Sequence, residues 1–382
     1  MNHYIRQSLC AFAVLATLVA LFNIWADPYN IYRFHSADTN RMSRIGQGLS
    51  MRLSKPWQVG QRKATAAIIG SSRSGSIPPT YGLWQEKNGF NLSMAGLTLY
   101  EMQRTIEHAQ AHGPLTELVI GLEYETFISG DYDVGLGFSE NRLAPWGSAD
   151  FYSQGLQDFL YTAFTISALT RSIMALNRRK PVTNWYFPDG RWENESRVWR
   201  GESGYVSVGK NMARLSKGAP SIYSGNLAAL SDILRYCHQQ NISVTLFISP
   251  EHIFLTGLRN TIAPLSNWEE FHQDLKNINL EIAGQYNHQP FPLWGFNHLT
   301  GIVNEPLPAG DIAPGAWFRD GIHFHGKLGA LLMEQMLGDS HYQAFDLRRD
   351  SVDDYLESVD NLREKFFSEN KTVVRRYLDK IL

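Results

Sequence analysis

Three short apolar runs restrict the fold of this 382-residue chain more than any other feature. They cover residues 64–69, 117–122 and 243–248; Gly70 follows the first run and Ser249-Pro250 follows the third. Runs this short are typical of strands that are buried on both faces of a sheet. Between these runs and after them, apolar residues recur at the spacing of a helix. We therefore predict a parallel sheet covered by helices on both faces, which is a three-layer α/β/α sandwich.

The remaining elements follow from the same patterns. Five stretches have apolar residues at helical spacing and are expected to form helices. A last short strand is expected at 291–294, where Pro292 restricts it to an edge or to a strand start. The five helical stretches are 99–112, 158–177, 226–240, 268–286 and 326–337.

The pattern divides the chain into consecutive parts. Residues 27–63 are polar and are interpreted as an irregular linker, and residues 64–340 as the α/β domain. Residues 128–220 interrupt the alternation and are interpreted as an insertion rather than an independent domain. Residues 341–382 are predicted to form charged surface helices as a C-terminal extension.

The insertion is rich in aromatic residues. Such rings could stack on the flat apolar faces of sugars, or they could form a small core within the insertion. The sequence leaves both interpretations open. The rings in question are Trp146, Trp185, Tyr186, Phe187, Trp192 and Trp199.

The N-terminal 26 residues contain an apolar run from Leu9 to Trp25 without a charged residue. Its length approaches the thickness of a bilayer, and we predict a signal anchor in residues 1–26. A cleaved signal peptide and a buried core helix are the alternatives. Arg6 precedes the run, whereas Arg33, Arg41 and Arg44 follow it, so a strict positive-inside count points against export. We still expect an exported body, because long domains translocate largely regardless of these charges.

Composition excludes several functions. Lys and Arg total 35 and Asp and Glu total 37, so the basic footprint of a nucleic-acid-binding protein is absent. The two cysteines, Cys10 and Cys237, form no CxxC motif and are not expected to pair. No His, Asp and Glu grouping has metal-ligand spacing. We expect neither a metal nor a cofactor.

Residues that could take part in catalysis follow the ends of predicted elements. They lie in three segments, residues 69–75, 91–96 and 317–325. Open α/β sheets bind ligands at the carboxyl edge of their strands. Asp320 and His323 are three residues apart, so one loop can hold both beside a serine. Acyl transfer needs such a serine, an imidazole base with an orienting carboxylate, and N–H donors for the oxyanion.

This combination resembles the SGNH, or GDSL-like, hydrolase superfamily over roughly residues 64–337. Gly70-Ser71-Ser72 stands where the family has Gly-Asp-Ser after its first strand, and Asp320-Gly321-Ile322-His323 is similar to its Asp-x-x-His block. The resemblance implies that Ser72 is the nucleophile, His323 the general base and Asp320 its orienter. The Gly-Ser-Ser form is similar to that of envelope members linked to D-alanyl and O-acetyl decoration of polymers.

Two positions depart from the family. Ser71 replaces its acidic residue, and Glu123 stands in the region where the family has an asparagine that donates to the oxyanion. The oxyanion hole would then consist of the backbone N–H groups of Ser72 and Gly96.

Five further residues are candidates for substrate binding. Arg73 is expected either to bind an anion or to pair with a carboxylate such as Glu123, and His252 either to line the cleft or to be a solvated loop histidine. His325 is the rival of His323 as the base. These candidates are Arg73, Asn91, Glu123, His252 and His325.

The sequence thus predicts an envelope-anchored serine esterase or O-acyltransferase that acts on acyl, expected to be acetyl, esters of a glycan or surface polymer. Its location would be the bacterial inner membrane, with the body on the periplasmic side. A multi-spanning membrane acyltransferase is the expected protein partner. The alternative is an inactive SGNH-like scaffold or glycan-binding subunit, motivated by the missing asparagine.

Overall fold

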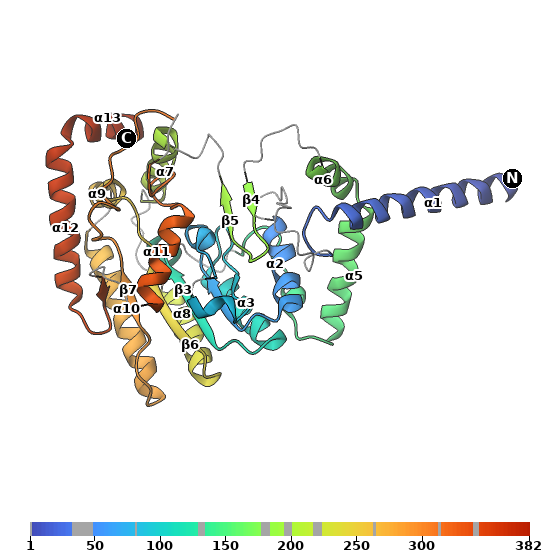
Figure 1. The fold of residues 1–382 in the computed structure, drawn as a ribbon, viewed down its shortest axis with the longest axis horizontal. Helices are drawn as coiled ribbons and strands as arrows, with labels where there is room; N and C mark the ends of the chain where they lie inside the picture. Colours follow the sequence, from blue (N-terminus) through green and yellow to red (C-terminus); the bar gives the residue numbers. More distant parts are fainter. Residues whose placement is uncertain are drawn as a thin grey trace.

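The structure is a computed structural model, and it describes most of the chain (Figure 1). The described residues are 2–32, 49–80, 82–128, 134–176, 184–194, 201–216, 224–262, 265–311, 315–338 and 344–382.

The chain alternates helices with short strands. The elements before the C-terminal half are α1 (Asn2–Ala26), α2 (Leu49–Arg62), β1 (Ala66–Ile69), η1 (Arg73–Ser76), η2 (Gly82–Gln85), β2 (Phe90–Asn91), α3 (Leu99–His112), β3 (Glu117–Leu122), α4 (Tyr124–Ile128), η3 (Glu140–Leu143), α5 (Ala149–Phe164), α6 (Ile166–Leu176), β4 (Asn184–Tyr186) and β5 (Trp192–Asn194). They are followed by α7 (Gly201–Ser216), α8 (Ser224–Gln239), β6 (Ser243–Ile248), α9 (Ile253–Ile262), α10 (Leu265–Gln285), β7 (Leu293–Gly295), α11 (Gly326–Leu337), β8 (Phe345–Asp346), α12 (Val352–Glu369) and α13 (Lys371–Ile381).

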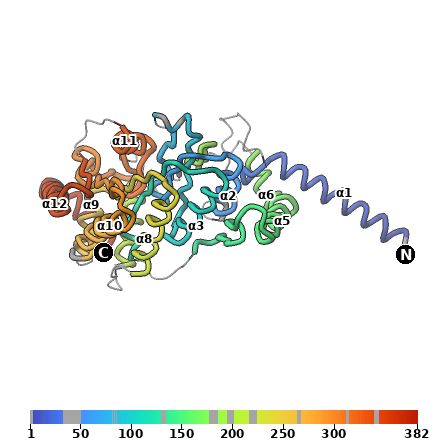
Figure 2. The backbone as a smooth tube through the Cα atoms, turned by 90° about the horizontal axis from the view of Figure 1, so that it is seen from below, coloured from blue at the N-terminus to red at the C-terminus, as the bar shows by residue number. Residues whose placement is uncertain are grey.

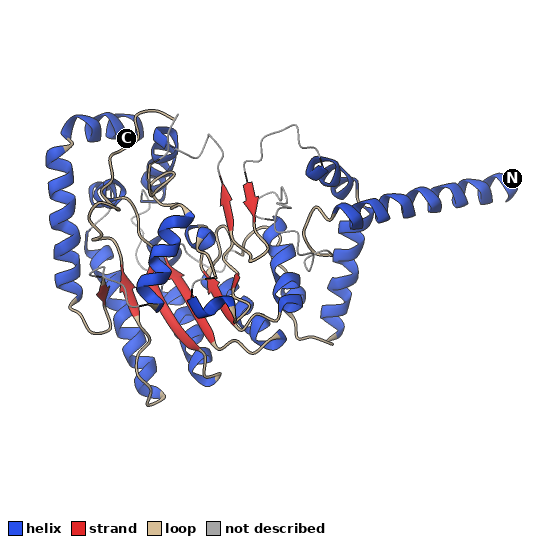
Figure 3. Ribbon diagram, viewed as in Figure 1, coloured by secondary structure: helices blue, strands red, loops and turns tan. Residues whose placement is uncertain are grey.

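Six strands form one sheet in the order β2-β1-β3-β6-β7-β8. The first five strands pair in parallel, and β8 pairs antiparallel with β7. The prediction of a mostly parallel sheet in a mixed α/β fold is therefore confirmed (Figure 3). Because the strands are parallel, their carboxyl ends meet at one edge of the sheet.

The predicted elements match where local signals are strong. β3 and β6 have the predicted bounds, and β1 lies within its predicted run. The helix α3 also has the predicted bounds, because a capping box between Thr98 and Glu101 satisfies its first N–H groups and Gly113 ends it. β7 begins directly after Pro292, which lacks the N–H that a central strand needs.

The prediction that residues 27–63 form an irregular linker was wrong over α2. This helix contains the buried side chains of Met51 and Val59, which belong to the main core, and it packs against α3. It also buries Arg52 and Lys55, so its core-facing side does not have an apolar pattern. Pro56 lies inside the helix, and a proline at such a position also argues against predicting a helix from the sequence.

The C-terminal extension is also more buried than expected. The helices α12 and α13 contribute Tyr355, Phe366 and Tyr377 to the main core. Tyr377 donates a hydrogen bond to the carbonyl of Pro308. The extension is therefore an integral part of the α/β body.

The insertion adds α5, α6, the β4–β5 hairpin and α7. Among its described rings, Tyr186 and Trp192 are buried in the main core, whereas Trp146 is exposed. Trp199 lies outside the described residues, as does the side chain of Trp185.

One described helix, α1, is long and apolar enough to cross a membrane. Most of its side chains are exposed. Figure 2 shows that it projects from one end of the body. Cys10 on α1 is exposed and Cys237 on α8 is buried, and both are free thiols, as expected.

Three buried histidines, His108, His252 and His272, make the stability of the fold depend on pH. Burial lowers the pKa of each to about 4. In the unfolded chain a histidine takes up its proton near pH ~6.5, so the unfolded state binds more protons between pH 6.5 and 4. Their contribution to stability is present above pH ~6.5 and is lost as the pH falls towards 4.

We therefore expect the melting temperature to fall as the pH is lowered from 6.5 to 5. For each histidine, the free energy of unfolding falls by at most about 1.4 kcal/mol per pH unit. Thermal unfolding of the full chain in detergent would measure it, and His272→Gln should make the fall smaller. A melting temperature that stays constant over this range would contradict the prediction.

Candidate active site

Ser72 lies in the turn between β1 and η1, at the carboxyl edge of the sheet. It precedes the first residue of η1 and is half-buried. The turn is tight, because a Cβ atom on Gly70 would lie 2.4 Å from the Ser74 hydroxyl and 3.2 Å from the carbonyl oxygen of Gly121. Only glycine fits at this position, and its small size lets the chain turn directly after the strand.

Ser72, His323 and Asp320 form a hydrogen-bonded chain. The Oγ atom of Ser72 lies 2.8 Å from Nε2 of His323, and Nδ1 of His323 lies 2.7 Å from Oδ2 of Asp320. An ionised carboxylate only accepts hydrogen bonds, so Nδ1 carries the proton and Nε2 of the neutral ring accepts from Ser72. The predicted geometry of these three side chains is confirmed.

The Asp320 carboxylate is fixed by its own turn. Its Oδ1 accepts N–H bonds from His323 at 2.8 Å and Ile322 at 3.2 Å. Gly321 has a φ of 91°, a left-handed conformation that favours glycine. Burial opposes ionisation of Asp320, but the His323 imidazole and its hydrogen bonds outweigh it, so the pKa of Asp320 lies below its usual value.

Two hydrogen bonds connect the loop of Asp320 and His323 to its neighbours. The Ser76 hydroxyl donates to the carbonyl of Phe324 at 2.9 Å, which joins the serine loop to the histidine loop. The N–H of His252 donates to the carbonyl of Gly321 at 2.7 Å. The histidine side chain is 21% exposed and Asp320 only 2%, so the base is reachable from solvent while its orienting carboxylate is not.

Gly96 lies in the loop after β2, beside the serine turn. The N–H of Met94 donates to the carbonyl of Gly70 at 3.1 Å, which brings the two loops together. Gly96 is exposed, and its φ is +59°. Arg52 donates to the carbonyls of Ala95 and Gly96, both at 3.0 Å, and to the Glu101 carboxylate. This guanidinium therefore fixes the conformation of the Gly96 loop.

Arg73, which follows Ser72 directly, is committed to a buried ion network. It contacts Glu125 at 2.6 Å and Glu251 at 3.4 Å. Arg259 contacts the same two carboxylates at 2.8 and 2.7 Å. Burial would raise the pKa of Glu125, but the two guanidinium charges lower it to about 2. Of the two interpretations of Arg73, the ion pair is the one that the structure shows.

Glu123 is buried at the end of β3, close to this network. Ser249 donates to its carboxyl at 3.3 Å, and Ser71 also hydrogen-bonds to it. Burial raises the pKa of Glu123 above its usual value, against the attraction of Arg73. Its carboxyl therefore keeps its proton to higher pH than an exposed glutamate does, and a protonated carboxyl can donate a hydrogen bond.

The other predicted site residues have structural contacts. Asn91 is fully buried and its amide donates to the carbonyls of Ser74 and Ile77, both at 2.9 Å. The expectation that His252 lines the cleft or is solvated was wrong, because its ring is buried and its Nε2 lies 2.7 Å from the carbonyl oxygen of Glu305. His325 stands at the N-cap position of α11, where its side chain makes no capping hydrogen bond, and the base position beside Ser72 is occupied by His323.

Several positioning residues were not predicted from the sequence. Lys55 is buried and donates to the carbonyls of Asn91, Ser93 and Gly190, and burial lowers its pKa to about 7. Glu305 accepts the N–H groups of Trp317 and Phe318 and so supports the loop before Asp320. These charged residues carry no local sequence signal, because their partners are distant in the chain.

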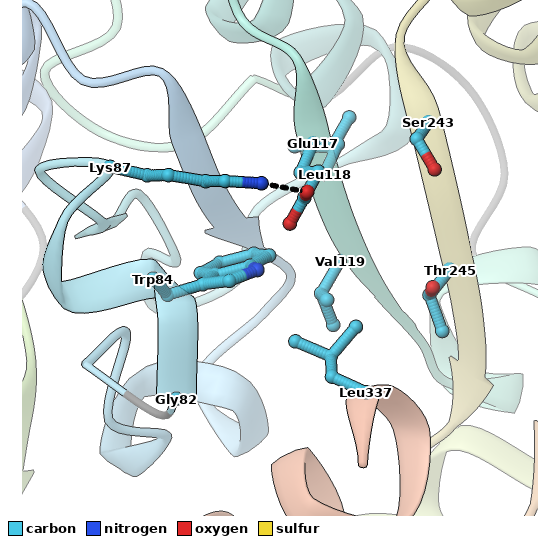
Figure 4. Close-up of a pocket in the computed structure, with 9 residues that line it drawn as sticks. All are labelled: Gly82, Trp84, Lys87, Glu117, Leu118, Val119, Ser243, Thr245 and Leu337. Atoms are coloured by element: carbon cyan, nitrogen blue, oxygen red, sulfur yellow. Dashed lines mark hydrogen bonds and ion pairs between the residues drawn. The ribbon is translucent and has the colours of Figure 1, made fainter.

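A hollow lies at the end of the strands opposite to Ser72. A cavity of about 240 Å³ is lined by residues at the beginnings of β3 and β6, together with η2 and Leu337 (Figure 4). Lys87 and Glu117 form an ion pair there. Neither Ser72 nor His323 lines this cavity. Among the described residues, no group of three or more His, Cys, Asp or Glu side chains is arranged to hold a metal ion.

A comparison of the sequence with protein-family models and with curated proteins found no match. The assignment of a function therefore depends on the geometry of the site.

The buried network around Arg73 gives a stability prediction. Arg73→Met leaves carboxylates of Glu125 and Glu251 with one guanidinium instead of two, and we expect a loss of about 3–5 kcal/mol in the free energy of unfolding. Arg235→Met is the matched control, because it breaks a partly exposed pair with Asp232 and should cost less than about 1 kcal/mol. Denaturant unfolding would measure both losses. If Arg73→Met cost no more than Arg235→Met, the network would have no structural role.

Proposed function

We propose that the protein is a serine esterase or O-acyltransferase of the SGNH type, acting on acyl esters of a glycan or cell-surface polymer. The observation that carries the proposal is the chain from Ser72 through His323 to Asp320, with contacts of 2.8 and 2.7 Å. The same three residues recur in unrelated serine enzymes as nucleophile, base and orienter. We further propose that helices cover both faces of its sheet, which makes the fold a three-layer α/β/α sandwich.

In the proposed reaction, His323 Nε2 takes the hydroxyl proton while Ser72 Oγ attacks the ester carbonyl. The negative charge that develops on the carbonyl oxygen is stabilised by the N–H groups of Ser72 and Gly96. When the intermediate collapses, the ester C–O bond breaks and His323 returns the proton to the departing alcohol. Water or a sugar hydroxyl then attacks the acyl-enzyme, giving hydrolysis in the first case and transfer in the second.

The position of the site supports the family assignment. Ser72 follows the first strand of the main sheet, and Asp320 and His323 lie between β7 and α11. Arg52 and Lys55 provide additional support by holding the loops that flank Ser72.

The apolar helix α1 motivates the proposed location and partners. A single-pass anchor in the bacterial inner membrane, with the body on the periplasmic side, would place the site where surface polymers are modified. A multi-spanning membrane acyltransferase would supply activated acyl groups to such a site.

A fluorophosphonate probe tests the nucleophile directly. We expect covalent labelling of the full chain in detergent, because the probe reacts with a serine activated by a neighbouring base. Labelling should disappear in Ser72→Ala and persist in Ser243→Ala, which changes an exposed serine at the start of β6. Complete absence of labelling in a folded wild-type protein would instead favour a non-catalytic scaffold.

Hydrolysis of p-nitrophenyl acetate tests the roles of His323 and Asp320. Asp320→Asn should reduce turnover by about 10⁴-fold, because the amide stabilises the wrong tautomer and cannot balance the imidazolium. The lowered pKa of Asp320 keeps it ionised above about pH 5 in the wild type. Turnover should therefore rise with pH as the imidazole becomes neutral, because only the neutral ring can accept the proton of Ser72.

Matched thermal melts of wild type and Asp320→Asn are the control for this experiment, and the Ser72→Ala rate gives the background. A pH-independent rate, or wild-type turnover in Asp320→Asn, would remove both residues from the mechanism.

A further inference from the structure

The helices α5 and α6 expose an unusual number of large apolar side chains. Nine lie on these two helices and another nine on α1, whereas only four lie among the described residues after 200: Leu215, Leu280, Leu337 and Leu382. The nine on α5 and α6 are Tyr152, Leu156, Phe159, Leu160, Phe164, Ile166, Ile173, Met174 and Leu176. Apolar patches of this kind mark an interaction surface.

The same two helices carry little exposed charge beyond Asp150, in the first turn of α5. Residues 151–176 contain only two charged side chains, Asp158 and Arg171. Asp158 is buried and accepts two hydrogen bonds of 2.7 Å from Arg142. Arg171 is half-buried and lies 5.6 Å from the centre of the Tyr29 ring. A protein surface that faced water would carry charges over such a length.

The end of α1 packs against both helices. Asn23 is fully buried, donates to the carbonyl of Ala163 at 2.8 Å and accepts from the Ser172 hydroxyl at 2.8 Å. Figures 1 and 2 both place α5 and α6 at the end of the body from which α1 leaves, with α5 running across α1. The apolar surfaces of the three helices are therefore continuous.

The length of α1 determines how close the bilayer comes to this surface. A hydrocarbon core of about 30 Å needs about 20 helical residues. From the charged Arg6 onwards, only residues 7–19 precede Ala20, where burial against the body begins, and they span about 20 Å. Even if Arg6 reaches back to the headgroups, residues 3–19 span only about 26 Å. The hydrocarbon core must therefore extend to the part of α1 that contacts α5 and α6.

We propose that α5 and α6 are a second membrane contact, which lies in the interface of the bilayer crossed by α1. The occupant of the apolar surface is the lipid bilayer, because the surface continues the apolar surface of α1 at the depth that its length requires. The bend of 59° between the two helices suits elements that lie along the interface rather than a single straight span. The inference does not depend on the proposed catalytic function.

Two contacts would fix the orientation of the body on the membrane. The hydrogen bond of 2.9 Å from Trp57 to Asp158 connects α5 directly to α2. Arg142 of η3 pairs with Asp158 and donates to the carbonyl of Arg52, which connects the two helices a second time. Because α2 also carries Arg52 and Lys55, which hold the loops beside Ser72, the site has a defined height above the bilayer.

Spin labels in the full chain test this contact. In a Cys10→Ser background, in which Cys237 stays buried, a label is placed at position 156, 160 or 173 and the protein is reconstituted into phosphatidylcholine–phosphatidylglycerol vesicles. We expect collisions with oxygen to exceed those with a water-soluble nickel chelate, as for side chains about 5–10 Å below the surface. Labels at Leu280 and Leu382, which are exposed elsewhere on the body, are controls and should show the reverse order.

Each other outcome contradicts the proposal. Nickel accessibility at positions 156, 160 and 173 equal to that at position 280 would mean that the surface faces water in the absence of another protein. Shielding from both reagents, together with dipolar broadening between labels, would mean that a second copy of the chain covers it. Unlabelled Leu156→Cys should melt at the wild-type temperature, because it changes an exposed side chain.

Discussion

The buried guanidinium of Arg52 is the interaction that connects the two halves of this structure. It pairs with Glu101 at 2.6 Å and holds the carbonyls of Ala95 and Gly96, while its own carbonyl accepts a bond from Arg142. Through α2, the helices α5 and α6 are thus joined to the loop beside Ser72. A guanidinium suits this role because its five donors can satisfy several acceptors at fixed angles.

This connection also explains why the chain places a helix between the anchor and the first strand. An irregular linker would leave the body free to move relative to α1. The buried helix α2 instead packs on α3 and is fixed to α5 through Trp57, and it contributes side chains both to the main core and to a second cluster of Tyr29, Ile31, Leu53 and Ala168. The position of the site relative to the anchor is a property of the fold.

The sequence was sufficient where the determining contacts are local. Short apolar runs predict strands such as β3 and β6. Asp320 and His323 are close enough along the chain for one turn to join them. Even Ser72 could be placed, since parallel strands bring their carboxyl ends to one edge.

Prediction failed where charged or polar side chains are buried by distant partners. Neither Arg52 nor Lys55 has an apolar pattern around it, and the acceptors of Lys55 lie 36, 38 and 135 residues away. For the same reason His252 was expected at the cleft, although it is buried against Glu305. Such contacts depend on tertiary structure, which no local signal reports.

The ion network beside Ser72 has a consequence for charge in the site. Two guanidiniums, from Arg73 and Arg259, face three carboxyl groups, and Glu125 and Glu251 contact both of them. Glu123 is the third carboxyl, and burial raises its pKa. When Glu123 holds a proton, the network is electrically neutral. A neutral network would not repel the negative charge of an oxyanion formed at Ser72. The backbone N–H groups could then stabilise this charge without the asparagine donor of the family that the sequence resembles.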